Sequence, residues 1–147
     1  MQTLDRFIYA QSGGRGASYE QALAELRSGW KVTHWIWYVL PQLRALGRSA
    51  TAREYGLADR AEAVDYLSHP VLGPRLLECV RAMLAHEHLR PEEILGAVDA
   101  MKFRSCLTLF ESVAPEPGVF RQALERFYGG QRDALTLELL NQPGAAQ

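Results

Sequence analysis

The chain has 147 residues, of which 48% are hydrophobic, and it carries 16 lysines and arginines against 17 aspartates and glutamates. This length is typical of one domain, which buries roughly 68–70% of the surface that its unfolded chain would expose. The net charge of −1 excludes a global positive field of the kind that attracts nucleic acid or an anionic membrane. We therefore expect a single domain over residues 1–147 that binds neither nucleic acid nor a membrane.

Helix signals recur along the chain, and no segment alternates with the period of two that is typical of a strand. Thr3 is placed to cap a short first helix, which the glycine-rich stretch 12–16 interrupts. Ser18 begins a second helix with the pattern of a capping box, and Gly29 ends it. These signals predict an all-α fold.

The run from Thr33 to Leu40 contains Trp35 and Trp37 and is apolar on nearly every side. We expect Thr33 to cap a helix here and Pro41 to end it, because a proline ring clashes with the preceding turn. A helix that is apolar all round is typical of the centre of a fold.

The second half of the chain repeats the same kinds of signal, in which a capping side chain or a proline marks the start of each helix. These starts are Asp59, Gly73–Pro74, Asp99, Pro117 and Asp133. The chain therefore predicts one compact domain of about seven to nine helices, with a frayed tail from about residue 141.

The two cysteines, Cys79 and Cys106, lie among apolar residues at helical spacing and form no metal-binding pattern. We expect buried free thiols, no metal and no cofactor. The chain shows no signal peptide and no stretch of about 20 apolar residues that would span a membrane. These observations predict a cytoplasmic location.

His34 is the histidine best placed for chemistry, and we expect it at the first position of the tryptophan-rich helix. The helix dipole would keep its ring neutral there, so that it could accept a proton or bind a ligand. Lys31, Trp35 and Trp37 are expected beside it. The alternative is that the histidine bonds a backbone carbonyl and the tryptophans fill the core.

A second group is formed by Lys102, Arg104 and Ser105. We expect both cations in the first turns of their helix, where the dipole disfavours positive charge and an anionic partner would offset it. A solvated face or an internal arginine–carboxylate pair is the alternative.

A third group lies near residue 48, where Arg48 and Ser49 precede a short helix that contains Tyr55. A glycine-containing turn into a helix offers free amides to a phosphate or carboxylate, although ordinary helices begin in the same way. We add Gln42 to this set of candidate ligand-binding residues.

Four motifs in order resemble a bacterial family catalogued as domain of unknown function 1810. They are HWIWY with PQ at 34–42, GRSA with EYG at 47–56, SHPVLG with RL at 68–76, and KFRS with TLF at 102–110. The resemblance covers nearly the whole chain. It implies an all-helical fold, sometimes compared with armadillo-like helical stacking, and no established activity. Some members carry the label calpastatin, but nothing in these residues supports protease inhibition.

Two functions follow as expectations. In the first, the tryptophans and His34 form a pocket that binds, and as an enzyme would hydrolyse, a phosphorylated or nucleotide-like ligand such as an ADP-ribose derivative. Arginine suits phosphate oxygens, and aromatic rings suit a base. The second is a helical module that binds a protein partner through an exposed apolar patch. The sequence leaves the choice between enzyme and module, and the oligomeric state, open.

Overall fold

The computed structural model describes residues 3–141, and these residues form ten α-helices and no strand. The helices are α1 Asp5–Tyr9, α2 Tyr19–Ser28, α3 Ile36–Val39, α4 Ala50–Tyr55, α5 Arg60–Ser68, α6 Leu72–Leu84, α7 Pro91–Leu95, α8 Ala97–Val113, α9 Gly118–Tyr128 and α10 Ala134–Leu140. The all-α prediction is confirmed. There is one helix more than the upper expected number because the single turn α7 counts separately. The predicted frayed tail lies, after residue 141, outside the described residues.

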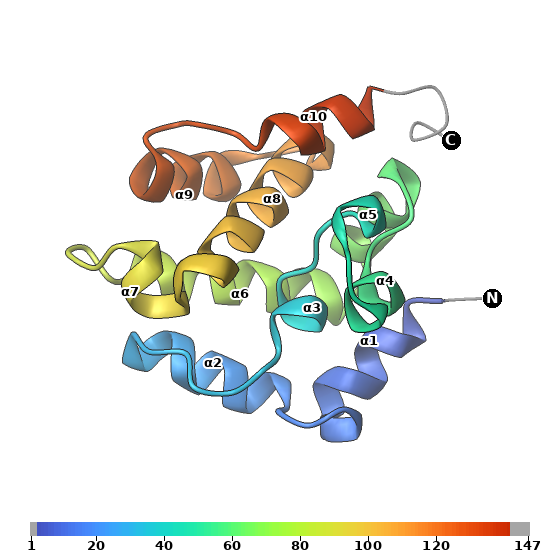
Figure 1. The fold of residues 1–147 in the computed structure, drawn as a ribbon, viewed down its shortest axis with the longest axis horizontal. Coiled ribbons are helices and arrows are strands. Elements are labelled where there is room, and N and C mark those ends of the chain that lie inside the picture. Colours follow the sequence, from blue (N-terminus) through green and yellow to red (C-terminus); the bar gives the residue numbers. More distant parts are fainter. Residues whose placement is uncertain (1–2, 142–147) are drawn as a thin grey trace.

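Two long helices, α6 and α8, organise the fold. α6 packs against α2, α5 and α9, and α8 packs against α5, α7, α9 and α10. In Figure 1, α8 runs diagonally through the centre, α9 and α10 lie at its upper end, and α2 lies along the lower edge. α8 is therefore the hub to which the other helices attach.

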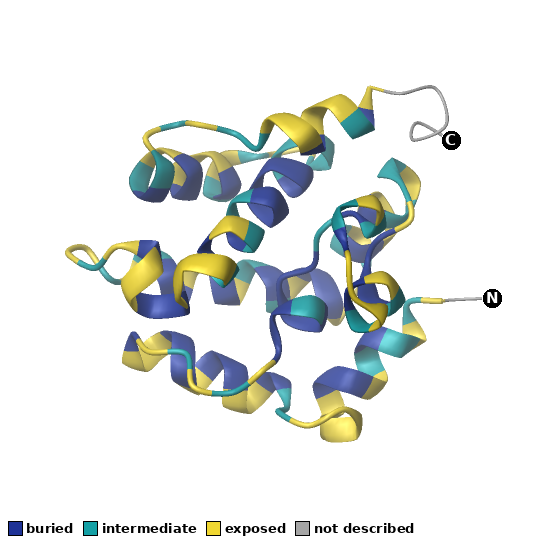
Figure 2. Ribbon diagram, in the orientation of Figure 1, coloured by how far each residue is buried: buried dark blue, intermediate teal, exposed yellow. Residues whose placement is uncertain are grey.

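The core explains why α8 occupies the centre. Its residues 105–110 are all buried, which requires neighbours on every side. Figure 2 shows the buried positions on the inner faces of α2, α6 and α8 and the exposed ones on the outer faces and in the loops. The tryptophan-rich run is buried as expected, with Trp35, Tyr38 and Leu40 at most 2% exposed. It does not form the long central helix, because α3 has only four residues, and α8 occupies that place.

Local signals set most helix ends. The side chains of Ser18, Asp59 and Asp133 accept hydrogen bonds from the third amide of α2, α5 and α10, as predicted. Gly29 ends α2 in the left-handed conformation. The predicted Asp99 cap is wrong: α8 begins at Ala97, and Asp99 lies inside its first turn.

Other starts shift by one to three residues. Thr3 accepts a hydrogen bond from the Asp5 amide, but the residue before α1 is Leu4. α6 begins at Leu72, so that Pro74 is its third residue. Proline is tolerated there because the first four amides of a helix have no partner within it.

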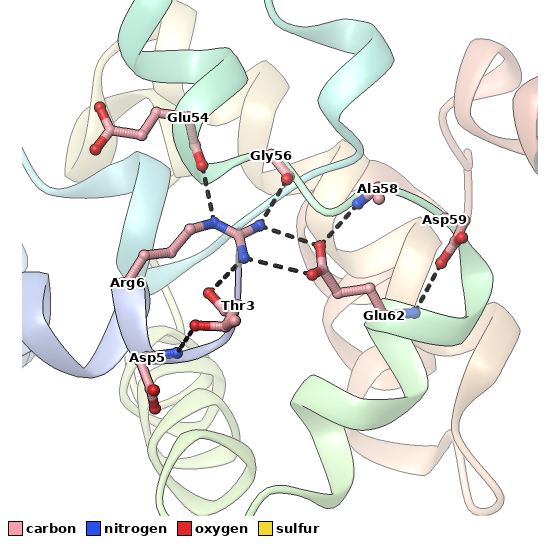
Figure 3. Close-up of polar contacts among 8 residues, drawn as sticks. All are labelled: Thr3, Asp5, Arg6, Glu54, Gly56, Ala58, Asp59 and Glu62. Atoms are coloured by element: carbon pink, nitrogen blue, oxygen red, sulfur yellow. Dashed lines mark hydrogen bonds and ion pairs between the residues drawn. The ribbon is translucent and has the colours of Figure 1, made fainter. Parts of the chain in front are cut away.

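Arg6 anchors the first helix to the turn between α4 and α5 (Figure 3). Its guanidinium donates to the backbone oxygens of Thr3, Glu54 and Gly56 and to both carboxylate oxygens of Glu62. Arg6 is thus satisfied within the fold, and its charge is balanced by a carboxylate. We assign it a structural role.

Among the described residues, no helix is both long enough and apolar enough to span a membrane.

Candidate functional site

The loop before α3 takes its shape from one buried carboxylate, that of Glu25 on α2. Glu25 accepts from the amides of Val32 and Thr33, at 2.8 and 3.0 Å. It also accepts from the Thr33 hydroxyl at 2.6 Å and from the indole N–H of Trp35 at 2.9 Å. Burial alone would raise the pKa of Glu25, but these bonds and one from Gln21 outweigh it and lower the pKa to about 2. Glu25 is therefore ionised at neutral pH.

This arrangement corrects the predicted start of the tryptophan-rich helix. Thr33 does not cap α3, because its hydroxyl is bound to Glu25. The residue before α3 is Trp35, which makes no side-chain cap, and the helix begins at Ile36. His34 consequently lies ahead of the helix on an exposed part of the loop and not at its first position.

Trp37 is the tryptophan that reaches a cavity. It lines a narrow crevice of about 10 Å³ together with Gln42 and Lys102, which is room for about one water molecule. The Lys102 ammonium lies 5.2 Å from the centre of the Trp37 ring. The Trp37 indole Nε1 is buried and has no hydrogen-bond partner among the described residues. A buried donor of this kind is costly unless an acceptor reaches it.

The crevice adjoins a wider groove of about 270 Å³, and Gln42 and Lys102 line both. The other lining residues come from η2 (Arg44–Leu46), from α8 and from the start of α10: Leu46, Val98, Met101, Ser105, Asp133 and Leu135. Three of them, Val98, Met101 and Leu135, are large exposed apolar residues. The groove thus combines an apolar rim with a few polar groups, which is the usual composition of a ligand site.

The position of Gln42 is fixed by backbone pairing. Leu43 and Leu57 form an isolated parallel bridge. The Leu57 amide donates to the Gln42 carbonyl at 2.9 Å, and the Arg44 amide donates to the Leu57 carbonyl at 2.7 Å. These bonds hold the loop after α3 against the segment that follows α4.

Acidic residues balance the cations of α8. Asp99 lies 2.9 Å from the Lys31 ammonium and 3.8 Å from that of Lys102. Arg104 lies 3.9 Å from Asp133, and its Nε is buried without a hydrogen-bond partner among the described residues. For the predicted group of Lys102, Arg104 and Ser105, the structure thus contains an internal arginine–carboxylate pair, which was the alternative to an anionic partner.

The structure brings four of the predicted site residues together, namely Trp37, Gln42, Lys102 and Ser105. Arg104 reaches the groove only through its ion pair with Asp133. The Lys31 side chain is 7% exposed and forms an ion pair with Asp99. It does not line the crevice or the groove.

The other predicted residues lie elsewhere. Trp35 and Tyr55 are in the core, at 0% and 1% exposure, and offer no surface to a ligand. Ser49 caps α4 by accepting from the Ala52 amide, and Arg48 is exposed beside it. His34 is not among the residues that line the crevice or the groove.

Sequence reasoning missed the apolar rim of Val98 and Met101. Both lie on one face of α8 with Lys102 and Ser105, at the helical spacing i, i+3, i+4 and i+7. That spacing was visible in the sequence. The buried apolar residues of α8 follow the same helical period, so the exposed apolar face could not be distinguished from them by spacing alone.

Among residues 3–141, no group of three or more histidines, cysteines, aspartates or glutamates is placed to hold a metal ion.

Comparison with solved structures gives a crystal structure of the conserved hypothetical protein Rv1873 from Mycobacterium tuberculosis. It is 41% identical to this chain, with a TM-score of 0.90, and the match covers 95% of this chain and 96% of that one. No curated protein matches the sequence. The model of the family "Protein of unknown function (DUF1810)" matches residues 1–140, and the chain therefore belongs to that family.

Proposed function

We propose that the groove between α8, α10 and the loop after α3 binds a small molecule with an apolar body and one anionic group, a phosphate or a carboxylate. The observation that carries this proposal is the buried Trp37 Nε1 donor, which has no acceptor among the described residues and lies beside Lys102. An anionic oxygen in the crevice would accept from Trp37 and be attracted by the Lys102 ammonium. The apolar body would contact Val98, Met101 and Leu135.

The size of the groove limits the ligand. Its volume of about 270 Å³ is just below the roughly 300–1,000 Å³ of typical ligand pockets. A nucleobase, a sugar phosphate or an aromatic acid fits this volume better than a complete ADP-ribose. We therefore narrow the nucleotide-like ligand expected from the sequence to a part of a nucleotide that fits this volume.

Binding, and not catalysis, is the function we propose. Hydrolysis would need a base next to the ligand, and His34 does not line the groove. Asp133, the carboxylate that does line it, already accepts from the amide and hydroxyl of Thr136. The proposal keeps the cytoplasmic location that the sequence predicts.

The test is thermal unfolding with a panel of phosphate monoesters, nucleotides, ADP-ribose and aromatic carboxylates. A ligand at 100 times its Kd stabilises by about 2.7 kcal/mol, which raises the Tm by several degrees in a domain of this size. Trp37→Phe keeps an aromatic six-membered ring and removes the pyrrole ring with its N–H, so we expect about tenfold weaker binding. Lys102→Gln should weaken binding of the same ligand.

The matched control is Trp30→Phe, because Trp30 is 71% exposed and does not line the groove. It should bind like the wild type. A panel without any shift, or a shift that both Trp37→Phe and Lys102→Gln keep in full, would overturn the proposal.

A protein-binding module is the second candidate, and the exposed rim of the groove favours it. Val98 and Met101 are 67% and 65% exposed, which is unusual for large apolar side chains on one helix face unless a partner covers them. If this function holds, the wild-type protein binds a protein partner that Met101→Glu does not bind, and no small molecule of the panel raises the Tm.

A further inference from the structure

A second groove lies between α2 and α6 and shares no lining residue with the first. Its volume is about 610 Å³, and its lining consists of Arg27, Pro74, Arg75, Glu78, Arg81, Ala82 and Ala85. Three arginines and one glutamate give it a local net charge of +2, in a chain whose total charge is −1. The positive charge is thus a property of this groove and not of the whole molecule.

Arg75 is held at this groove by neutral groups. Its Nη1 donates to the side-chain oxygen of Gln11 at 3.1 Å. Its guanidinium lies 4.7 Å from the centre of the Tyr19 ring. Burial and a hydrogen bond to Glu78 raise the pKa of Tyr19 well above its ordinary value, so the ring stays uncharged. Arg75 is therefore positioned without losing its charge to a carboxylate partner.

The orientation of Gln11 is itself fixed by the fold. Gln11 is 1% exposed and lies in the π-helical turn η1, Ala10–Gly14. Its amide nitrogen donates to the Tyr38 carbonyl at 2.7 Å and to the Tyr66 hydroxyl at 3.2 Å. These two acceptors require the amide nitrogen to point inward, and the oxygen consequently faces Arg75.

The remaining charges leave two guanidiniums without a carboxylate. Glu78 accepts from the Tyr19 hydroxyl and from Arg27. Arg75 has no carboxylate within ion-pair distance among the described residues, and the side chain of Arg81 makes neither a hydrogen bond nor an ion pair with them. Arg6 differs from these two arginines, because its guanidinium donates hydrogen bonds to Glu62 and to backbone carbonyls.

We propose that the groove between α2 and α6 binds a small ligand with two or more phosphate groups, anchored by Arg75 and flanked by Arg27 and Arg81. The guanidinium fork matches phosphate oxygens. Arg75 and Arg81 are six residues apart on α6, a rise of about 9 Å along the helix axis. Because both residues also line the same groove, a chain of linked phosphates can contact the two guanidiniums at once. The site does not depend on the groove of the proposed function.

The test is isothermal titration calorimetry in a phosphate-free buffer at matched ionic strength, with tripolyphosphate, ATP, orthophosphate and adenosine. We expect tripolyphosphate and ATP to bind at least tenfold more tightly than orthophosphate. If tripolyphosphate and ATP bind with equal affinity, the site recognises the phosphates alone. If ATP binds more tightly, the site also contacts the nucleoside. Adenosine that binds as tightly as ATP would overturn the proposal.

Three variants locate the site. Arg75→Gln should weaken tripolyphosphate binding at least tenfold, and Arg81→Gln several-fold. Because the Arg81 side chain is exposed and makes no hydrogen bond or ion pair with the described residues, its variant keeps the test valid even if Arg75→Gln does not fold. Arg53→Gln is the control: Arg53 is exposed, its side chain donates to the Gly47 carbonyl, and it lies outside the groove.

The control should bind within twofold of the wild type. Absence of binding by the wild type, or equal losses in Arg53→Gln and Arg75→Gln, would contradict the assignment. If Lys102→Gln loses tripolyphosphate binding and Arg75→Gln retains it, the phosphates bind in the groove that Lys102 lines and the assignment is wrong.

Discussion

At the scale of single residues, the buried carboxylate of Glu25 accepts five hydrogen bonds. It is 5% exposed and receives donors from its own helix and from the loop that leads into α3. Such bonds hold the charged form of the carboxylate. The shape of the loop, and with it the position of Trp37, therefore depends on one negative charge.

Replacement of Glu25 by glutamine should destabilise the fold by on the order of 2 kcal/mol at pH 7, because several bonds to a charged group weaken together. Its pKa of about 2 is below the unfolded value of about 4.3. The stabilisation is thus complete above the unfolded pKa and is lost as the pH falls toward 2. Urea unfolding at pH 7 and pH 3 should show a smaller gap between wild type and variant at the lower pH.

Glu20→Gln is the control for this experiment. Glu20 is an exposed residue in the first turn of the same helix, and its replacement should change the unfolding free energy by less than about 0.5 kcal/mol. A Glu25→Gln gap that is the same at both pH values would show that the charge is not the source of the stability.

Glu25 also explains why the loop could not be predicted from its own sequence. Thr33 has the residue type and spacing of a cap, and nothing nearby in the chain contradicts that interpretation. Its hydroxyl is instead bound by a carboxylate eight residues upstream. The same holds for Asp99, which has the residue type of a cap but whose carboxylate pairs with Lys31, a residue far from it in sequence.

At the scale of elements, α5 and α6 approach each other closely at Gly73. A Cβ at this position would lie well inside van der Waals contact with the Leu67 carbonyl oxygen. Because the obstacle is backbone, no side-chain rotation relieves it. The turn between the two helices therefore requires a residue without a side chain.

Gly73→Ala should destabilise the protein by about 1–3 kcal/mol, the usual cost of overpacking. Gly118→Ala is the matched control, since a Cβ at Gly118, the first residue of α9, would meet no atom within 4 Å. That change should be neutral or stabilise by about 0.4–1 kcal/mol. Urea denaturation of both variants checks the difference, and similar midpoints for the two would refute the close-contact explanation.

Helix ends were predictable where the cap lies next to the helix that it begins. Ser18, Asp59 and Asp133 are of this kind, because each accepts from an amide three residues ahead. Which helix lies at the centre was not predictable in this way. α8 and the tryptophan-rich run are both strongly apolar, and only the packing of the other helices distinguishes them.

At the scale of the whole molecule, the two cysteines lie within one continuous core. Cys79 on α6 and Cys106 on α8 are both buried free thiols, as predicted. Burial, with a smaller contribution from Glu78, raises the pKa of Cys79 to about 12, and burial raises that of Cys106 well above its ordinary value. We therefore expect both thiols to be unreactive in the folded state.

We expect neither thiol to react with a disulfide-exchange reagent such as DTNB at pH 8 in native conditions. Because the thiols lie on the two central helices, exposing either of them should require global unfolding. In urea, both should react over the same transition that circular dichroism reports. Labelling of one thiol before any loss of helical signal would show that part of the molecule opens independently.

Much of the candidate site was predictable because it lies in two of the four sequence motifs. Trp37 and Gln42 belong to the first and Lys102 and Ser105 to the last, and the fold brings them to one groove. The position of the Arg75 guanidinium was not predictable. It depends on Gln11, which lies 64 residues away and shows no motif.

The three tryptophans occupy three different environments within one short stretch of chain. Trp30 is 71% exposed, Trp35 is fully enclosed, and Trp37 lies under the ammonium of Lys102. Acrylamide would therefore quench the fluorescence of Trp30 first and leave the blue-shifted emission of Trp35 until the chain unfolds. We expect the emission between these two from Trp37, and a ligand in the proposed groove should change it, so that binding could be followed without an attached dye.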